Sequence, residues 1–176
     1  MTDRLFFALW PDAHLRSSLS ERVPHVLEGL GGKPQRPDQW HVTLEFLGEV
    51  ASDRQAALHG AAGRVRAEPF TVSFDEFHHW HKPQVVCLAA SVIPGPLAGL
   101  VAGLRAALAE EGFKPEDRDF RPHVTLARKV KAARPGRLDP PLAWPADRFA
   151  LVRSVTDPAG SRYEPLHWWN LSGRAA

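Results

Sequence analysis

Cysteine is almost absent from this chain of 176 residues, which contains only Cys87. A disulfide within the chain is therefore impossible, and the apolar run 85–88 around Cys87 predicts a buried, unreactive thiol. No apolar run approaches the roughly 20 residues that a membrane-spanning helix needs. The first residues also lack the basic segment and the apolar segment of a secretory signal peptide. We therefore expect a cytoplasmic protein that does not enter a membrane.

A dominant sign of charge is also lacking. The chain has 22 Lys and Arg against 20 Asp and Glu, which gives a formal net charge of +2 at pH 7. Such a mildly basic chain can bind an anion, but its charge alone does not indicate nucleic-acid binding. Its length suits one domain or two small lobes packed together. No linker separates independent domains, so we expect a single domain, 1–176, made of two intertwined lobes.

One tetrapeptide occurs twice. His41-Val42-Thr43-Leu44 returns unchanged as His123-Val124-Thr125-Leu126. Each copy sits among apolar and β-branched residues, which predicts a strand. Successive side chains of a strand point to opposite faces, so His and Thr share one face while Val and Leu share the other. Two similar scaffolds therefore each present an imidazole beside a hydroxyl, and we take this pair as the candidate active site.

The remaining pattern predicts an α+β fold. Helical spacing of apolar residues predicts helices at about 11–32, 52–67 and 97–111. Apolar or alternating runs predict strands at 4–10, 40–47, 70–77, 85–92, 123–130, 149–155 and 163–171. The stretch 78–83 and the proline-rich stretch 132–145 are expected to be loops. Each motif strand follows a helix and a loop, which indicates a crude internal duplication into two similar lobes with helices packed outside antiparallel sheets.

Two histidines that face one substrate can divide acid–base chemistry. The unperturbed pKa of histidine lies close to neutral pH. A neutral imidazole can accept a proton from the attacking nucleophile, and a protonated one can give a proton to the leaving oxygen. The hydroxyls of Thr43 and Thr125 can donate hydrogen bonds to non-bridging phosphate oxygens, where charge grows in the transition state. Such a site needs no metal and suits the opening of a strained cyclic phosphodiester by water.

The residues around both tetrapeptides resemble the paired signatures of the 2H phosphoesterases. These stretches are 41–48 (HVTLEFLG) and 121–128 (RPHVTLAR). Within that superfamily they are most similar to the RNA 2′,3′-cyclic phosphodiesterases of the LigT type, also called 2′-5′ RNA ligases. The opening 4–8 resembles the first strand of that family, and the segment 154–166 resembles its C-terminal Gly-x-x-Tyr-x-x-Leu pattern. The chain departs from the family at Gln39-Trp40, where Asn-Leu is often found.

The resemblance implies a bilobal α+β fold, with two pseudo-symmetric antiparallel sheets and the active-site cleft between them. It also implies metal-independent hydrolysis of an RNA terminal 2′,3′-cyclic phosphate to a 2′-phosphate, with His41 as proton donor and His123 as proton acceptor. It implies neither cofactor nor metal, and the partners would be RNA ends or small cyclic nucleotides. We expect a monomer. The implied substrate contacts are Thr43, Thr125, Arg128 and Tyr163.

Some assignments stay open at this point. In a regular strand, Arg128 lies on the face opposite His123, so a surface arginine is the alternative to a phosphate contact. Phe46 is expected in the core by the same alternation. Tyr163 either lies near the cleft or packs in the core or at the rim.

Rival functions also remain. The first is 2′-5′ RNA ligation, the reverse of the same chemistry with a ribose hydroxyl as nucleophile. The second is an RNA-end binding module without catalysis, against which the two intact histidine–threonine pairs argue. The third is a metal hydrolase that uses His78, His79 and His81, but zinc sites need three or four ligands in tight geometry and no spacing completes one here. A solvated hairpin tip is the favoured interpretation of those three histidines.

Overall fold

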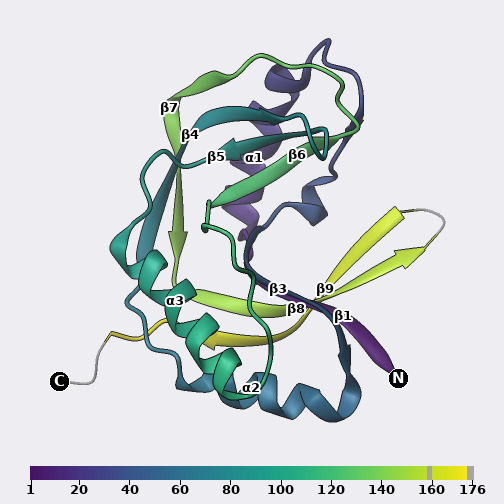
Figure 1. The fold of residues 1–176 in the computed structure, drawn as a ribbon. Helices are drawn as coiled ribbons and strands as arrows, with labels where there is room; N and C mark the ends of the chain where they lie inside the picture. The colour runs from purple at the N-terminus through teal and green to yellow at the C-terminus, as the bar shows by residue number, and fades with distance from the viewer. Residues whose placement is uncertain (158–159, 174–176) are drawn as a thin grey trace.

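The computed structural model describes residues 1–157 and 160–173, and this part of the chain has the predicted α+β fold (Figure 1). Its helices are α1 (Ala13–Leu27), α2 (Gln55–Arg64) and α3 (Gly95–Glu110), with 3₁₀ turns η1 (Pro37–Gln39) and η2 (Ser52–Arg54). Its strands are β1 (Thr2–Leu9), β2 (Lys33–Pro34), β3 (Val42–Ala51), β4 (Phe70–Trp80), β5 (Val85–Ala89), β6 (His123–Arg128), β7 (Gly136–Ala146), β8 (Arg148–Asp157) and β9 (Gly160–Asn170).

The strands form two antiparallel halves that join at the repeated tetrapeptides. The order is β7-β4-β5-β6-β3-β1-β8-β9, with the short β2 paired to β6. We call β1, β3, β8 and β9 the first half-sheet, and β4, β5, β6 and β7 the second. The register between β3 and β6 consists of one pair, Val42 with Val124. These residues hold the same position in the two copies, as a pseudo-two-fold arrangement requires, and their pairing makes one continuous sheet of the two halves.

The helices cross from one half-sheet to the other. Helix α1 follows β1 of the first half-sheet but contacts β6 of the second, whereas α3 follows β5 of the second and contacts β3 of the first. In Figure 1, α1 lies behind the strands of the upper half, and α2 and α3 lie beside the lower half. The predicted apolar stripe of α3 is buried. None of the helices in the described ranges is long and apolar enough to cross a membrane.

Two predicted loops are wrong, because both contain strand residues. Strand β4 continues to Trp80 and pairs with β5 to that point, so 78–80 are not loop. The stretch 136–146 forms β7, which pairs with β4 at the edge of the sheet. Proline is tolerated on an edge strand because the missing N–H breaks no ladder on the free side. The burial of Leu142, Trp144 and Ala146 alternates in the manner of a strand.

Strand β3 contains a bulge directly after its motif threonine. Thr43 and Glu45 pair with consecutive residues of β1, so Leu44 between them is an extra residue. An inserted residue reverses the alternation of side chains beyond it. Phe46 therefore shares the face of Thr43 and is only partly buried. The face predicted for it is wrong, although it packs against the small buried cluster of Phe6, Ala8, Ala150 and Val152.

Strand β6 contains the equivalent bulge. Thr125 and Ala127 pair with consecutive residues of β5, so Leu126 is the extra residue. Arg128 consequently lies on the same face as His123 and Thr125, and not on the opposite face that a regular strand predicts. The two copies of the tetrapeptide thus share a bulge at the same position as well as the same sequence.

Candidate active site

The same backbone contact orients both histidines. Nδ1 of His41 lies 2.7 Å from the carbonyl oxygen of Gln39, and Nδ1 of His123 lies 2.7 Å from the carbonyl oxygen of Arg121. A carbonyl only accepts, so Nδ1 carries the proton of each neutral ring and donates it. Nε2 is then the nitrogen left for chemistry in both rings. Nε2 of His41 accepts from the hydroxyl of Thr43 at 3.1 Å.

Aromatic side chains enclose the two imidazoles. The His41 ring stacks on Trp10, with ring centroids 5.6 Å apart and planes 11° apart. The Tyr163 ring meets the His41 ring edge-on, with ring centroids 5.0 Å apart. Tyr163 therefore lies beside the cleft, which was one of the two positions predicted for it. Trp80 meets His123 edge-on at 4.5 Å. Trp80 was missed because 78–83 was interpreted as a loop, although the strand pattern that begins at 70 continues through it.

The surroundings of His41 oppose its protonation. Burial lowers the pKa of His41 to about 4, against the hydrogen bond to the Gln39 carbonyl, and positive charge on His123 and Arg128 adds to the lowering. In the protein alone, His41 is therefore neutral at pH 7.

His123 experiences similar forces. Burial lowers its pKa, and the guanidinium groups of Arg118 and Arg128 lower it further. The hydrogen bond to the Arg121 carbonyl and the carboxylate of Glu116 act in the opposite direction. Arg128 thus acts on both imidazoles, which fits its position on the histidine face of β6. A bound anion would oppose this lowering and favour the protonated form of either ring.

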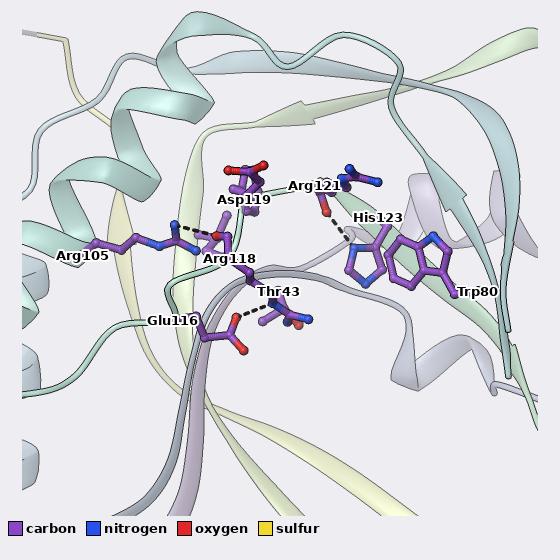
Figure 2. A pocket seen from close by; sticks show the side chains of 10 residues that line it. Thr43, Trp80, Arg105, Glu116, Arg118, Asp119, Arg121 and His123 are labelled. Atoms are coloured by element: carbon purple, nitrogen blue, oxygen red, sulfur yellow. Dashed lines mark hydrogen bonds and ion pairs between the residues drawn. The ribbon is translucent and has the colours of Figure 1, made fainter. Parts of the chain in front are cut away.

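Two pockets meet at Thr43, which lines both. Figure 2 shows the first, the His123 pocket, where the His123 ring faces Trp80. Its other lining residues are Thr43, Leu44, Arg105, Glu116, Arg118, Asp119, Phe120 and Arg121. The second, the His41 pocket, is lined by Arg4, Phe6, His41, Thr43, Phe46, Arg128, Ser154, Thr156, Ser161 and Tyr163.

The structure therefore brings together five of the six predicted site residues around these pockets. The sixth, Thr125, lies on the His123 face of β6, because it pairs with Cys87 two residues along the strand from the pair formed by Ala89 and His123. It is partly exposed but is not a lining residue of either pocket.

The buried carboxylate of Glu45 anchors the loop that leads to His123 through hydrogen bonds. The side chain of Glu45 is fully buried and accepts hydrogen bonds from Nε of Arg105 at 2.8 Å and from the backbone N–H of Glu116 at 2.5 Å. Arg105 also donates to the carbonyl of Arg118 at 3.1 Å (Figure 2). Sequence reasoning missed this contact. Its signal is a glutamate inside the apolar run that follows the first motif.

Of the three histidines at and just beyond the end of β4, His79 and His81 meet edge-on with ring centroids 4.6 Å apart, but His78 does not join them. Nε2 of His78 lies 3.0 Å from a carboxylate oxygen of Glu76. Nε2 of His79 donates to the carbonyl of Val130 at 2.9 Å, and consecutive strand residues point to opposite faces. Within the described ranges, no group of three or more His, Cys, Asp or Glu side chains could hold a metal ion. The geometry of His78, His79 and His81 therefore gives no support to a zinc site.

The two halves of the chain match the same protein family. The family model described as LigT like phosphoesterase matches residues 10–87 and again 88–163. Each matched stretch contains one copy of the tetrapeptide.

Individual relatives and a solved structure cover nearly the whole chain. The RNA 2′,3′-cyclic phosphodiesterase of Escherichia coli is 34% identical over 172 residues, which are 96% of this chain and 97% of the relative. The RNA 2′,3′-cyclic phosphodiesterase of Thermus thermophilus is 36% identical over 184 residues, with 97% of this chain and 91% of the relative covered. The crystal structure of E. coli LigT complexed with 3′-AMP matches with a TM-score of 0.89 and 32% identity, covering 98% of this chain and 99% of that one.

Proposed function

Because this chain belongs to the family of LigT-like phosphoesterases, we propose that it hydrolyses the 2′,3′-cyclic phosphate at an RNA end to a 2′-phosphate. The names of the relatives from E. coli and T. thermophilus support this reaction. The observation that carries the proposal is the matched pair His41 and His123. Both rings are fixed through Nδ1 by a carbonyl, and they line two pockets that meet at Thr43.

The reaction needs one proton acceptor and one proton donor. Nε2 of His123 takes a proton from water as the water oxygen forms a bond to phosphorus. The bond between phosphorus and the ribose 3′ oxygen breaks, and Nε2–H of His41 gives its proton to that oxygen. The phosphate stays on the 2′ oxygen, and the two histidines exchange protonation states over the cycle. No metal takes part in these steps.

The negative charge of the bound phosphate favours protonation of His41. A bound anion favours the imidazolium form, which opposes the lowering of the His41 pKa by burial. The guanidinium of Arg128 and the hydroxyls of Thr43 and Thr125 bind the non-bridging oxygens and stabilise the charge that develops on them. Tyr163 supports the His41 ring at its edge.

Substitution of either histidine tests this proposal. We expect His41→Ala and His123→Ala each to lower kcat on an oligonucleotide ending in a 2′,3′-cyclic phosphate by about 10²–10⁴-fold, the usual contribution of a general acid or base. His14→Ala, on the exposed side of α1, is the control and should retain full activity. EDTA should leave the wild-type rate unchanged. A histidine variant that is folded by circular dichroism and turns over at the wild-type rate would contradict the proposal.

Ligation is the second candidate, and the two pockets on either side of Thr43 favour it. One pocket can hold the nucleotide with the cyclic phosphate while the other holds an RNA with a free 5′ hydroxyl. Incubation of both RNAs with the enzyme, followed by product analysis, separates the two reactions. A 2′-5′ linked product indicates ligation, and a 2′-phosphate alone indicates hydrolysis. Tight binding of the cyclic end with neither product would indicate a binding module.

A further inference from the structure

The His41 pocket contains two guanidinium groups, and the proposed reaction uses only one of them. Arg128 lines this pocket together with His41 and Thr43. Arg4 lines another part of the same pocket, with its guanidinium 4.8 Å from the centre of the Phe46 ring. The hydrolysis of one cyclic phosphate leaves Arg4 without a role.

Arg4 also differs from Arg153 and Arg162 of the same half-sheet, which both have a carboxylate partner. Arg153 lies 2.6 Å from Glu164, and Arg162 lies 3.3 Å from the same carboxylate group. Across the described part of the chain, no carboxylate lies within ion-pair distance of Arg4. Even Glu49, its cross-strand partner on β3, forms no ion pair with it. The guanidinium turns to Phe46 and the pocket instead, where it is available to an anion.

Hydroxyl groups accompany Arg4 in this pocket. Ser154 pairs with Arg4 across β1 and β8, and Thr156 pairs with Ser161 across β8 and β9. All four residues line the His41 pocket. Hydroxyls and a guanidinium are the donors that proteins offer to phosphate oxygens.

The two ends of the pocket are too far apart for one phosphate. Thr43 pairs with Ala8, and Arg4 lies four residues along β1 from Ala8. At about 3.3 Å per residue this is roughly 13 Å of strand between the two backbone positions. A phosphate held at Thr43 therefore lies beyond hydrogen-bonding distance of the hydroxyl of Ser154. The Arg4 guanidinium itself reaches back over the ring of Phe46, which pairs with Phe6, two residues from Ala8 and so roughly 7 Å along the strand. Successive phosphates of an RNA chain are separated by a span of this size.

We propose that Arg4, with Ser154, Thr156 and Ser161, binds a second phosphate of the substrate, namely the phosphodiester on the 5′ side of the terminal nucleotide. This inference rests on the proposed function and specifies its substrate class. The enzyme acts on RNA chains in preference to cyclic mononucleotides, because only a chain places a second anion at Arg4. The terminal nucleoside lies between the two phosphates, along the surface of β1 and β8.

Two substrates that differ by one phosphate test the inference. The first is a dinucleotide that ends in a 2′,3′-cyclic phosphate, and the second is a 2′,3′-cyclic mononucleotide without a 5′ phosphate. We expect wild type to prefer the dinucleotide in kcat/KM by about tenfold or more, the value of one charge-assisted hydrogen bond. Arg4→Ala should bring the ratio close to one, mainly through KM. It should also reduce the slope of log KM against log salt by about 0.7, whereas Arg4→Lys should retain that slope.

Arg148→Ala is the matched control. Arg148 lies on the ring of Trp168 at 4.3 Å, so it makes the same kind of contact as Arg4, but it lies outside the His41 pocket. Its substitution should leave the substrate ratio at the wild-type value. If Arg4→Ala leaves the ratio unchanged, or lowers both kcat/KM values equally, Arg4 only packs on Phe46 and the inference is wrong.

A binding experiment separates this inference from the proposed function. The probes are a dinucleotide with a 3′-phosphate and a nucleoside 3′-phosphate, titrated by calorimetry. Wild type should bind the dinucleotide about tenfold more tightly, and Arg4→Ala should lose that advantage. Wild type could prefer the dinucleotide probe through Arg4 and still hydrolyse neither cyclic substrate. The proposed hydrolysis would then be wrong, while the second phosphate site would stand. Equal affinity of wild type for both probes would overturn the site.

Discussion

In the protein without substrate, the hydrogen bonds of His41 fit the neutral form of the ring. Its Nδ1–H donates to the carbonyl of Gln39, and its Nε2 accepts from the hydroxyl of Thr43. The proposed role as proton donor needs the opposite charge state. A group with a depressed pKa loses its proton as the pH rises through the lower value, so a pKa of about 4 leaves little imidazolium at pH 7. The substrate must therefore change the protonation of this residue.

The depressed pKa of His41 predicts a shift that NMR can measure on the ring signals of this residue. We expect His41 to titrate near pH 4 without ligand and to move upward by more than one pH unit with saturating inorganic phosphate, because the anion favours the imidazolium. The kinetic counterpart is that kcat/KM, which reports free enzyme, has its optimum at a lower pH than kcat. Both midpoints belong to the coupled histidine pair.

His14 serves as the control in the same spectra, because it is exposed on α1 and should not respond to phosphate. A titration of His41 at pH 6 to 7 without phosphate would show that burial does not control its charge. If the titration midpoint of His41 stays the same in phosphate, a bound anion does not control the protonation of His41.

At the scale of secondary-structure elements, Glu45 links the strand of the first motif, β3, to the loop that leads to the second motif. The carboxylate of Glu45 joins β3 to α3 through Arg105 and to the loop through the N–H of Glu116. That loop also carries Arg118, whose charge lowers the pKa of His123. Glu45 is therefore a positioning residue, which acts on the chemistry through His123 and its charged neighbours.

We expect Glu45→Gln to lower kcat about tenfold with a smaller effect on KM, because it removes the charge that holds Arg105 while substrate contacts remain. Its cost in the free energy of unfolding should be about 1–3 kcal/mol, below that of a fully buried ion pair because Arg105 is partly exposed. The limb of the pH–rate curve that reports His123 should also shift. Glu45→Asp should recover part of the activity. Glu21→Gln, on the exposed side of α1, is the control. A loss of stability without any change in the pH–rate curve would leave Glu45 a purely structural role.

The sequence predicted the elements that have a regular period and missed those that break it. The stripe of α3 and the face division of the motif strands follow from periods of 3.6 and 2, and both are present. The bulges at Leu44 and Leu126 have no such signal, because pairing with a neighbouring strand decides where an extra residue is accommodated. Phe46 and Arg128 were therefore placed on the wrong faces. The prolines of β7 concealed the alternation of Leu142 and Trp144.

At the scale of the whole molecule, the two half-sheets share one core. The largest cluster of buried apolar side chains includes residues of both half-sheets and of all three α-helices in the described ranges. Helix α1 leaves the first half-sheet and packs against the second, so neither half can bury its apolar face with its own segment alone. We propose on this basis that residues 1–176 act as a single domain of two intertwined lobes.

A single shared core predicts that damage on one side spreads to the other. Leu19 of α1 is 1% exposed, and Leu19→Ala should lower the free energy of unfolding by about 2–5 kcal/mol, the usual cost of a core cavity. Hydrogen exchange under native conditions should show the same loss of protection for the amides of β5 and of β1, because both become exposed in one unfolding event. Ser17→Ala, on the exposed side of the same helix, should change neither. Loss of protection confined to the second half-sheet would mean that the lobes unfold separately, and the alignment of His41 with His123 would then depend on local links such as the pairing of Val42 with Val124 and the hydrogen bonds of Glu45.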